Sequence, residues 1–241
     1  PAVIPALPEL LDVYGAERVL HVRWTNGTEF AAPDAAFYVA DMPSAWHAYG
    51  VFESVPGGID QSALRGGPCK RLQGTVLVLK DRWIAWDTPV TGDGQAGREA
   101  LRVELCRMLP GIWALPGEVR RLAMLEPEPA RITFAPRDAL GLGIFGAALV
   151  AEFDAPHGTV ELFITYPREF AQASLEFEML RIWLRRRAIS GVQIEHGATV
   201  DLFVPDERVG YLFVTLSSNE LRGVRGMRTV ADARTLLARW E

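Results

Sequence analysis

Three glycines form the one stretch of this sequence that resembles a cofactor-binding motif. Gly141, Gly143 and Gly146 follow the G-x-G-x-x-G pattern, whose glycines admit the pyrophosphate of a dinucleotide against the N-terminus of a helix. That interpretation requires a strand before the motif and a helix after it. No convincing strand precedes Gly141, and the residues after Gly146 have the pattern of a strand. The sequence therefore favours flexible or closely packed backbone here, and we predict no cofactor.

The histidines and serines show no catalytic or metal-binding pattern. The histidines stand at positions 21, 47, 157 and 196, without H-x-x-x-H or H-E-x-x-H spacing. His47 lies between Trp46 and Tyr49, where a satisfied, partly buried histidine is more common than a metal ligand or a base. Ser217 and Ser218 fall in a predicted turn, and no G-x-S-x-G elbow exists. We therefore predict neither catalytic residues nor a metal site.

A group of arginines is the first candidate for an interaction surface. Arg181, Arg185, Arg186 and Arg187 lie near the end of a predicted helix, where they could bind an anionic partner. Cations at a helix C-terminus also interact favourably with the helix dipole, by about 0.3–1 kcal/mol each, and this role alone accounts for them. Arg185 and Arg186 are therefore candidate interaction residues, with the dipole as the competing explanation.

Two tryptophans are the second candidate. Trp83 and Trp86 fall on opposite faces of a predicted strand, so one of them could be exposed. An exposed tryptophan on a sheet favours a contact with a protein or a glycan. Packing of both rings in the core is the competing interpretation.

The arginines belong to the clearest structural pattern in the chain, residues 159–187. Alternate apolar residues from 160 to 164 predict a largely buried strand, and Pro167 ends it because proline lacks the N–H that a strand ladder needs. Apolar residues at three-four spacing then predict a long helix that covers one face of a sheet. They are Phe170, Ala173, Phe177, Leu180 and Leu184, widened by Trp183.

Shorter patterns fill the remaining sequence. Strands are predicted at 18–24, 35–42, 76–79, 83–86, 147–153, 198–204, 210–216 and 220–226. Helices are predicted at 5–14, at 44–52 and at 118–125, and Gly50 interrupts or caps the second of these. A further helix is predicted from the apolar positions Leu101, Leu105, Met108 and Leu109. A last helix begins at Thr229, where Thr229 and Asp232 have the spacing of a capping box.

These elements predict an α+β fold of two related halves, residues 1–117 and 118–241. Each half has the order hairpin, helix, hairpin, helix, with an antiparallel sheet and helices packed on one face. Pro43 and Pro167, which both follow a predicted strand, suggest an internal duplication, although α+β proteins also reuse hairpins independently. The halves could also pack as one domain.

Composition restricts the class of protein. The net charge of −5 argues against a nucleic-acid binder, and 49% hydrophobic residues suffice for a real core. The longest apolar run is too short for a transmembrane helix, and any signal peptide or lipid anchor has been removed or never existed. Cys69 and Cys106 are either one disulfide or two inert thiols, with thiols slightly favoured.

Several segments resemble one protein family. They are residues 37–52 (FYVADMPSAWHAYGVF), 76–86 (VLVLKDRWIAW) and 160–175 (VELFITYPREFAQASL), together with Leu109-Pro110. In these segments the chain resembles DUF6599, a bacterial family with no established activity. Because many of its members look exported, the resemblance implies a periplasmic or cell-envelope location and leaves a cytoplasmic one open.

The sequence thus predicts a non-catalytic binding or scaffold protein of the bacterial cell envelope, whose partners are other protein chains. A role as accessory subunit of a larger complex and a peripheral membrane association are both compatible with it. The alternative is a small-molecule-binding or enzymatic domain with a site in the cleft between the halves, where His47 and residues 141–146 are the first candidates.

Overall fold

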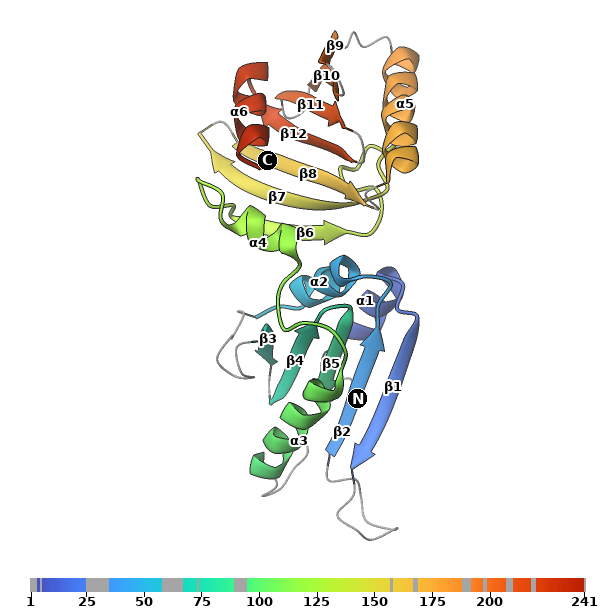
Figure 1. Cartoon of the computed structure of the whole chain (residues 1–241), viewed down its shortest axis with the longest axis vertical. Coiled ribbons are helices and arrows are strands. Elements are labelled where there is room, and N and C mark those ends of the chain that lie inside the picture. Colours follow the sequence, from blue (N-terminus) through green and yellow to red (C-terminus); the bar gives the residue numbers. More distant parts are fainter. Residues whose placement is uncertain are drawn as a thin grey trace. The chain divides into compact units, whose positions relative to one another are not determined.

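The computed structural model describes residues 4, 6–24, 35–57, 67–72, 74–88, 95–156, 158–166, 169–187, 192–196, 199–206, 210–217 and 220–240. The chain forms two compact units, Pro1–Gly117 and Glu118–Glu241. Each unit contains one antiparallel sheet with helices packed against it (Figure 1).

The first unit has a five-stranded sheet in the order β1-β2-β5-β4-β3. All its neighbouring strands are antiparallel. Its strands are β1 Arg18–Trp24, β2 Ala35–Asp41, β3 Cys69–Leu72, β4 Thr75–Lys80 and β5 Trp83–Asp87, and its helices are α1 Leu7–Val13, α2 Ala45–Ser54 and α3 Gln95–Met108.

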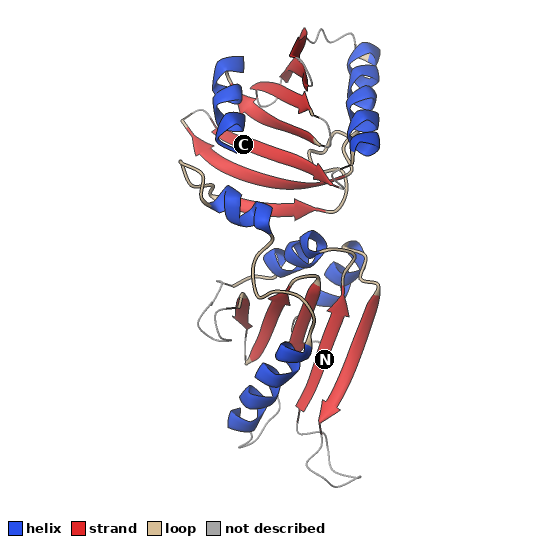
Figure 2. Ribbon diagram, viewed as in Figure 1, coloured by secondary structure: helices blue, strands red, loops and turns tan. Residues whose placement is uncertain are grey.

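Helices cover both faces of this sheet at its central strands (Figure 2). Every residue of β4 is buried, and successive strand residues point to opposite faces. Val78 packs with Cys106 of α3 on one face. On the other face, Lys70 is the cross-strand neighbour of Leu77 and donates to the carbonyl oxygen of Val55 just after α2, at 2.6 Å. The two helices therefore enclose β4 between them.

The second unit has a seven-stranded antiparallel sheet in the order β6-β7-β8-β12-β11-β10-β9. Its helices are α4 Gly117–Ala123, α5 Phe170–Arg186 and α6 Val230–Trp240. Its strands are β6 Arg131–Ala135, β7 Ala147–Ala155, β8 Gly158–Tyr166, β9 Val192–His196, β10 Thr199–Asp206, β11 Gly210–Leu216 and β12 Leu221–Met227.

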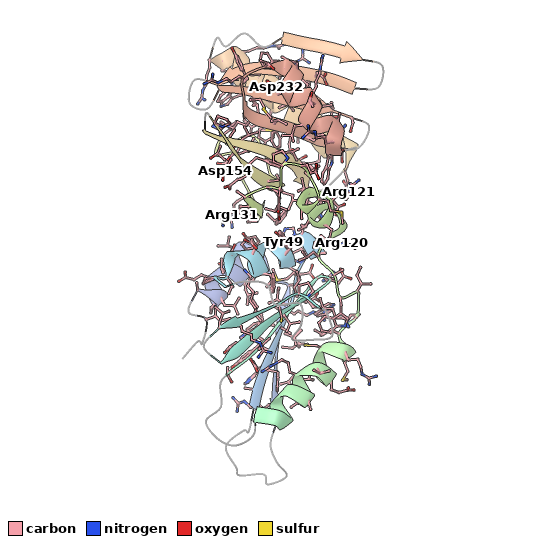
Figure 3. All side chains as sticks on the ribbon, turned by 90° about the vertical axis from the view of Figure 1, so that its left-hand side faces the viewer. Tyr49, Arg120, Arg121, Arg131, Asp154 and Asp232 are labelled. Carbon is pink, nitrogen blue, oxygen red and sulfur yellow. The ribbon has the colours of Figure 1, made fainter. Side chains whose placement is uncertain are left out.

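Helices α5 and α6 lie on opposite faces of the second sheet. Phe163 of β8 packs with Phe177 of α5. Val160 is on the other face of β8, where it lines a groove together with Leu236 of α6. Helix α4 carries Arg121 (Figure 3). The Arg121 guanidinium lies 4.6 Å from the centre of the Trp240 ring of α6 and so joins the two helices.

The predicted α+β class with antiparallel sheets is confirmed, with two corrections. Helices cover both faces of each sheet instead of one, because residues 76–79 of β4 and the middle of β8 are apolar and buried on both sides, which leaves no polar face for solvent. Each sheet also contains more strands than predicted, because β3, β6 and β9 were not predicted.

The two units have the same strand pairing around their middle helix. In each unit the strand before the middle helix pairs with the last strand before the final helix, as β2 pairs with β5 and β8 pairs with β12. Pro43 stands between β2 and α2, while Pro167 lies outside the described residues. An origin by duplication stays a prediction, and the common strand pairing supports it.

Three predicted helix features can be compared with the structure. Thr229 caps α6 at the predicted position, because its Oγ1 accepts from Asp232 N–H at 3.1 Å and donates to Asp232 Oδ2 at 2.7 Å. Helix α2 continues through Gly50 to Ser54, so Gly50 neither interrupts nor caps it. Met108, one of the apolar positions that predicted α3, is 72% exposed, because α3 turns Arg102 towards the sheet instead.

Candidate functional site

Helix α5 carries apolar side chains on two opposite sides. Its inner stripe packs against the sheet, and residues between 170 and 186 include no proline or glycine to interrupt the helix. The predicted buried positions Ala173, Phe177, Leu180 and Leu184 are confirmed as buried. The side chain of Phe170 lies outside the described part of the structure.

The outer side of α5 exposes three large apolar side chains. Leu175, Met179 and Ile182 are 55%, 41% and 45% exposed. With Arg186 they follow a four-three-four spacing, which aligns the four side chains along a helix. At about 100° per residue this line lies opposite the side that carries Phe177. We call these four residues the outer stripe of α5.

Charged groups surround the outer stripe. Arg181 donates to Glu178 at 2.7 Å across one turn of the helix. Arg185 and Arg186 are exposed in the last turn, and the Arg187 guanidinium lies 4.0 Å from the centre of the Trp183 ring. The predicted candidates Arg185 and Arg186 therefore extend an exposed apolar surface that was not predicted from the sequence. The four-three-four spacing of apolar residues in the sequence, on the side of the helix opposite the predicted core stripe, could have indicated this surface.

A buried glutamate fastens α5 to the loop between β6 and β7. Glu176 is 1% exposed, and its Oε1 accepts hydrogen bonds from Gln172 Nε2 at 2.9 Å and from Gly146 N–H at 3.1 Å. A Cβ added at Gly146 would lie 3.1 Å from the same oxygen. Gly146 therefore serves close packing of the loop on α5.

The remaining glycines of the motif shape the same loop. A strand does precede the motif, contrary to the prediction, since β6 ends at Ala135, but β7 and not a helix follows it. Gly141 and Gly143 both have φ of 66°, and Gly143 N–H donates to Asp138 Oδ1 at 2.6 Å. The apolar side chains of the loop, Leu140, Ile144 and Phe145, are buried. The loop is a packed connection without the helix N-terminus that a pyrophosphate site requires.

Trp83 and Trp86 lie on opposite faces of β5. Trp83 packs, partly buried, beside the core under α3, with the Arg82 guanidinium 6.0 Å from its ring centre. Trp86 lies parallel to the Tyr38 ring at 5.2 Å, and Tyr38 lies parallel to the His21 ring at 4.5 Å. The structure therefore does not bring the two tryptophans together, and their role as an interaction surface stays a prediction.

His47 belongs to the start of α2. Ser44 caps this helix, since its Oγ accepts from His47 N–H at 3.4 Å and lies 2.9 Å from His47 Nδ1. Burial lowers the pKa of His47 below its ordinary value. This contact gives His47 a role in helix capping.

The two cysteines are buried free thiols in one core cluster. Of the two alternatives that the sequence left open, the structure therefore shows thiols. Burial raises the pKa of Cys106 to about 11. Because the thiolate is the nucleophile, Cys106 is unreactive near neutral pH.

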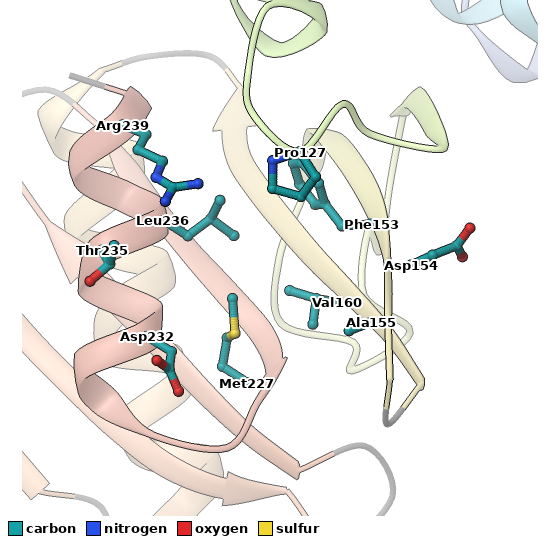
Figure 4. Close-up of a pocket in the computed structure, with 10 residues that line it drawn as sticks. All are labelled: Pro127, Phe153, Asp154, Ala155, Val160, Met227, Asp232, Thr235, Leu236 and Arg239. Atoms are coloured by element: carbon teal, nitrogen blue, oxygen red, sulfur yellow. The ribbon is translucent and has the colours of Figure 1, made fainter.

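A groove of about 280 Å³ lies between α6 and the β7–β8 hairpin (Figure 4). The apolar side chains of Phe153, Val160 and Leu236 line it, and the exposed Asp232 and Arg239 also border it. Ligand pockets usually measure about 300–1,000 Å³, so this groove would hold only a small apolar group.

Among the residues that the structure describes, no group of three or more His, Cys, Asp or Glu side chains could hold a metal ion. The helices in this part of the chain are all too short or too polar to cross a membrane. Comparison with protein families, curated proteins and solved structures found no match for this chain.

Proposed function

We propose that this protein is a non-catalytic binding or scaffold protein, an accessory subunit that docks on another protein chain through the outer stripe of α5. The observation that carries this proposal is the exposed line of Leu175, Met179 and Ile182 on a helix whose opposite side is buried. A helix with two apolar sides is typical of an element packed between its own core and a partner.

The spacing of the outer stripe favours a helix as the partner element. Apolar residues at four-three intervals fit between the side chains of a facing helix, as in coiled coils. Arg185 and Arg186 would face acidic residues on that helix. The partner is therefore expected to present an amphipathic helix with an acidic end.

The stripe alone would not make a tight complex. Complete burial of one large aliphatic side chain contributes about 1.5–3 kcal/mol, and Leu175, Met179 and Ile182 are already about half buried. Their remaining contribution of roughly 3 kcal/mol in total is well below the about 8 kcal/mol of a micromolar complex. The flanking ring of Trp183 and the arginines must add contacts, as aromatic and arginine side chains commonly do in interfaces.

The cell-envelope location is part of the same proposal. It is supported only by the resemblance to DUF6599, many of whose members look exported. Fractionation of the native cells would test it separately, because a cytoplasmic protein could use the same stripe.

Site-specific photo-crosslinking tests the docking surface. A crosslinker in place of Leu175 or Ile182 should capture one defined partner in native cells. A crosslinker in place of Met124, an 80% exposed side chain outside the outer stripe, should not capture it. With that partner purified, Met179→Glu should weaken binding at least tenfold and Met124→Glu should leave it unchanged. Equal crosslinking from all positions, or full binding by Met179→Glu, would contradict the proposal.

The alternative, small-molecule binding, is favoured by the groove between α6 and the β7–β8 hairpin. A site in a cleft between the halves stays a prediction. Screening small apolar compounds by thermal shift, with Val160→Trp as the variant that fills the groove, would distinguish this function from protein docking.

A further inference from the structure

Strand β1 forms an open edge of the first sheet. The strand order places β1 at one end, and no strand among the described residues lies beyond it. In an edge strand, alternate residues direct their N–H and C=O groups away from the sheet. Alternate residues of this seven-residue strand therefore offer main-chain groups to an additional strand.

The middle of β1 lacks the features by which edge strands usually avoid pairing. Such features are charges, prolines and bulges. The register with β2 is unbroken over the whole strand, and the charged Arg18 and Arg23 stand towards its two ends. Between them Val19, Leu20 and Val22 are 50%, 56% and 39% exposed. Apolar side chains are thus exposed on both faces of the same edge strand.

A stack of parallel rings also ends at this edge. Trp86, Tyr38 and His21 are cross-strand neighbours on β5, β2 and β1. The planes of His21 and Tyr38 differ by 3°, and those of Tyr38 and Trp86 by 10°. His21 is exposed and is the last ring of the row. A planar side chain opposite His21 on an added strand would extend the stack.

We propose that β1 pairs antiparallel with β1 of a second copy, about a two-fold axis at His21, so that the two sheets join into one. His21 is the middle residue of β1, so this register overlaps both strands completely. On one face, Leu20 would lie opposite the partner's Val22, and on the other the two His21 rings would stack. Such a closed, isologous contact requires a strand that complements itself.

The self-complementary pattern distinguishes a second copy from an unrelated peptide. Around His21, each exposed apolar residue on the Leu20 face meets another apolar residue, and no like charges lie directly opposite each other. A pair of short strands buries less than the about 1,200 Å² of a standard interface, so the dimer should be weak. This proposal is independent of the outer stripe of α5, which lies in the other unit.

The mass of the full chain in solution is the first test. Sedimentation should show a monomer at low micromolar concentration that shifts towards a dimer at high micromolar concentration. Leu20→Lys should abolish the shift, because it places a charge in the middle of the edge. Val13→Lys, on the similarly exposed Val13 of α1, should retain it. A monomer at every concentration, or a dimer unaffected by Leu20→Lys, would overturn the proposal.

A register-specific disulfide is the second test. Directly opposite residues of an antiparallel pair have Cα atoms about 4.5–5.5 Å apart, within the range that a disulfide spans. His21→Cys should therefore crosslink into a dimer under mild oxidation, while the native Cys69 and Cys106 stay buried. In Val19→Cys the two new thiols would stand about 13 Å apart along the strands and should not react. Equal crosslinking by both variants, or no crosslinking by either, would contradict the register. If β1 pairs with another protein instead, that protein and not a second copy is the partner of this edge.

Discussion

Lys80 Nζ lies 3.0 Å from the carbonyl oxygen of Cys106, close to the end of α3. The same ammonium donates to the carbonyl oxygens of Arg107, at 3.4 Å, and of Leu109. The last carbonyls of a helix have no donor within the helix, and an ammonium with three N–H groups can satisfy three of them. Lys70 has the same role after α2. The only two lysines of the chain therefore both complete helix ends.

Replacing Lys80 should destabilise the first unit. Lys80→Met keeps most of the side-chain volume but leaves the carbonyl groups without their donor, so we expect a loss of roughly 2–3 kcal/mol in the free energy of unfolding. Lys80→Arg should also lose stability, because a planar guanidinium cannot direct its N–H groups to three convergent oxygens. Urea unfolding measures both effects. Arg107→Met, in the same turn but exposed, is the control and should change little.

Gly50 should not tolerate alanine, although it lies inside a helix. A Cβ at this position would stand 2.2 Å from Cε1 of the buried Tyr14 ring. We expect Gly50→Ala to cost about 1–3 kcal/mol through overpacking, whereas alanine normally favours a helix by about 1 kcal/mol. In Gly117→Ala, where no atom lies within 4 Å, no such loss should be observed.

A double-mutant cycle identifies the cause. In the background of Tyr14→Ala the ring is absent, so the effect of Gly50→Ala should change from a loss to a gain of stability. The same loss in both backgrounds would mean that the Tyr14 contact is not responsible. Thermal unfolding of the four proteins measures this coupling.

Local patterns explain which parts of the fold could be predicted. The inner stripe of α5 and the helix cap at Thr229 depend on residues within a few positions of each other, and the described residues of both confirm the prediction. Strand β9 carries an alternating pattern, Val192–His196, that was overlooked. Strand β3 is only four residues long with two basic residues, so its sequence carries little signal.

Long-range contacts explain what the sequence could not show. Met108 belongs to the apolar spacing that predicted α3 and is nevertheless exposed, because a buried ion pair with Asp87 turns Arg102 towards the sheet. The partner of Arg102 is far along the chain, and an arginine in a helix normally indicates an exposed position. The outer stripe of α5 was missed for a related reason, since one apolar stripe already accounted for the helix.

The Asp87–Arg102 pair should be important for the stability of the first unit. Asp87 is 1% exposed, its Oδ1 accepts from Val76 N–H at 2.8 Å, and its Oδ2 accepts from Arg102 Nε at 3.2 Å. Arg102→Met removes the Arg102 cation from a buried carboxylate, and we expect a loss of about 3–5 kcal/mol. Adding Asp87→Asn to this variant should recover part of the loss, since the amide oxygen can still accept from Val76. No recovery in denaturant unfolding would mean that shape, and not the uncompensated charge, causes the loss.

Cys106 should make the stability of the protein depend on alkaline pH. Burial raises the pKa of Cys106 from 9.0 to about 11 in the folded chain. Below pH 9 both the folded and the unfolded chain hold this proton, so its contribution is constant. Between pH 9 and about 11 the unfolded chain has released the proton and the folded chain still holds it. The free energy of unfolding therefore falls as pH rises through this range, by roughly 2–3 kcal/mol in all.

Comparison with Cys106→Ala isolates this thiol from the other groups that titrate at alkaline pH. The variant loses a constant packing contribution at every pH but should show a shallower decline of stability between pH 9 and about 11. Urea unfolding of both proteins at several pH values across this range measures the difference. Parallel declines would show that the folded chain does not protect the Cys106 proton.

Burial of the Cys106 thiol also predicts slow alkylation. Iodoacetamide should modify Cys106 in the native protein at pH 8 only as fast as the protein unfolds, because the thiolate is the reacting species.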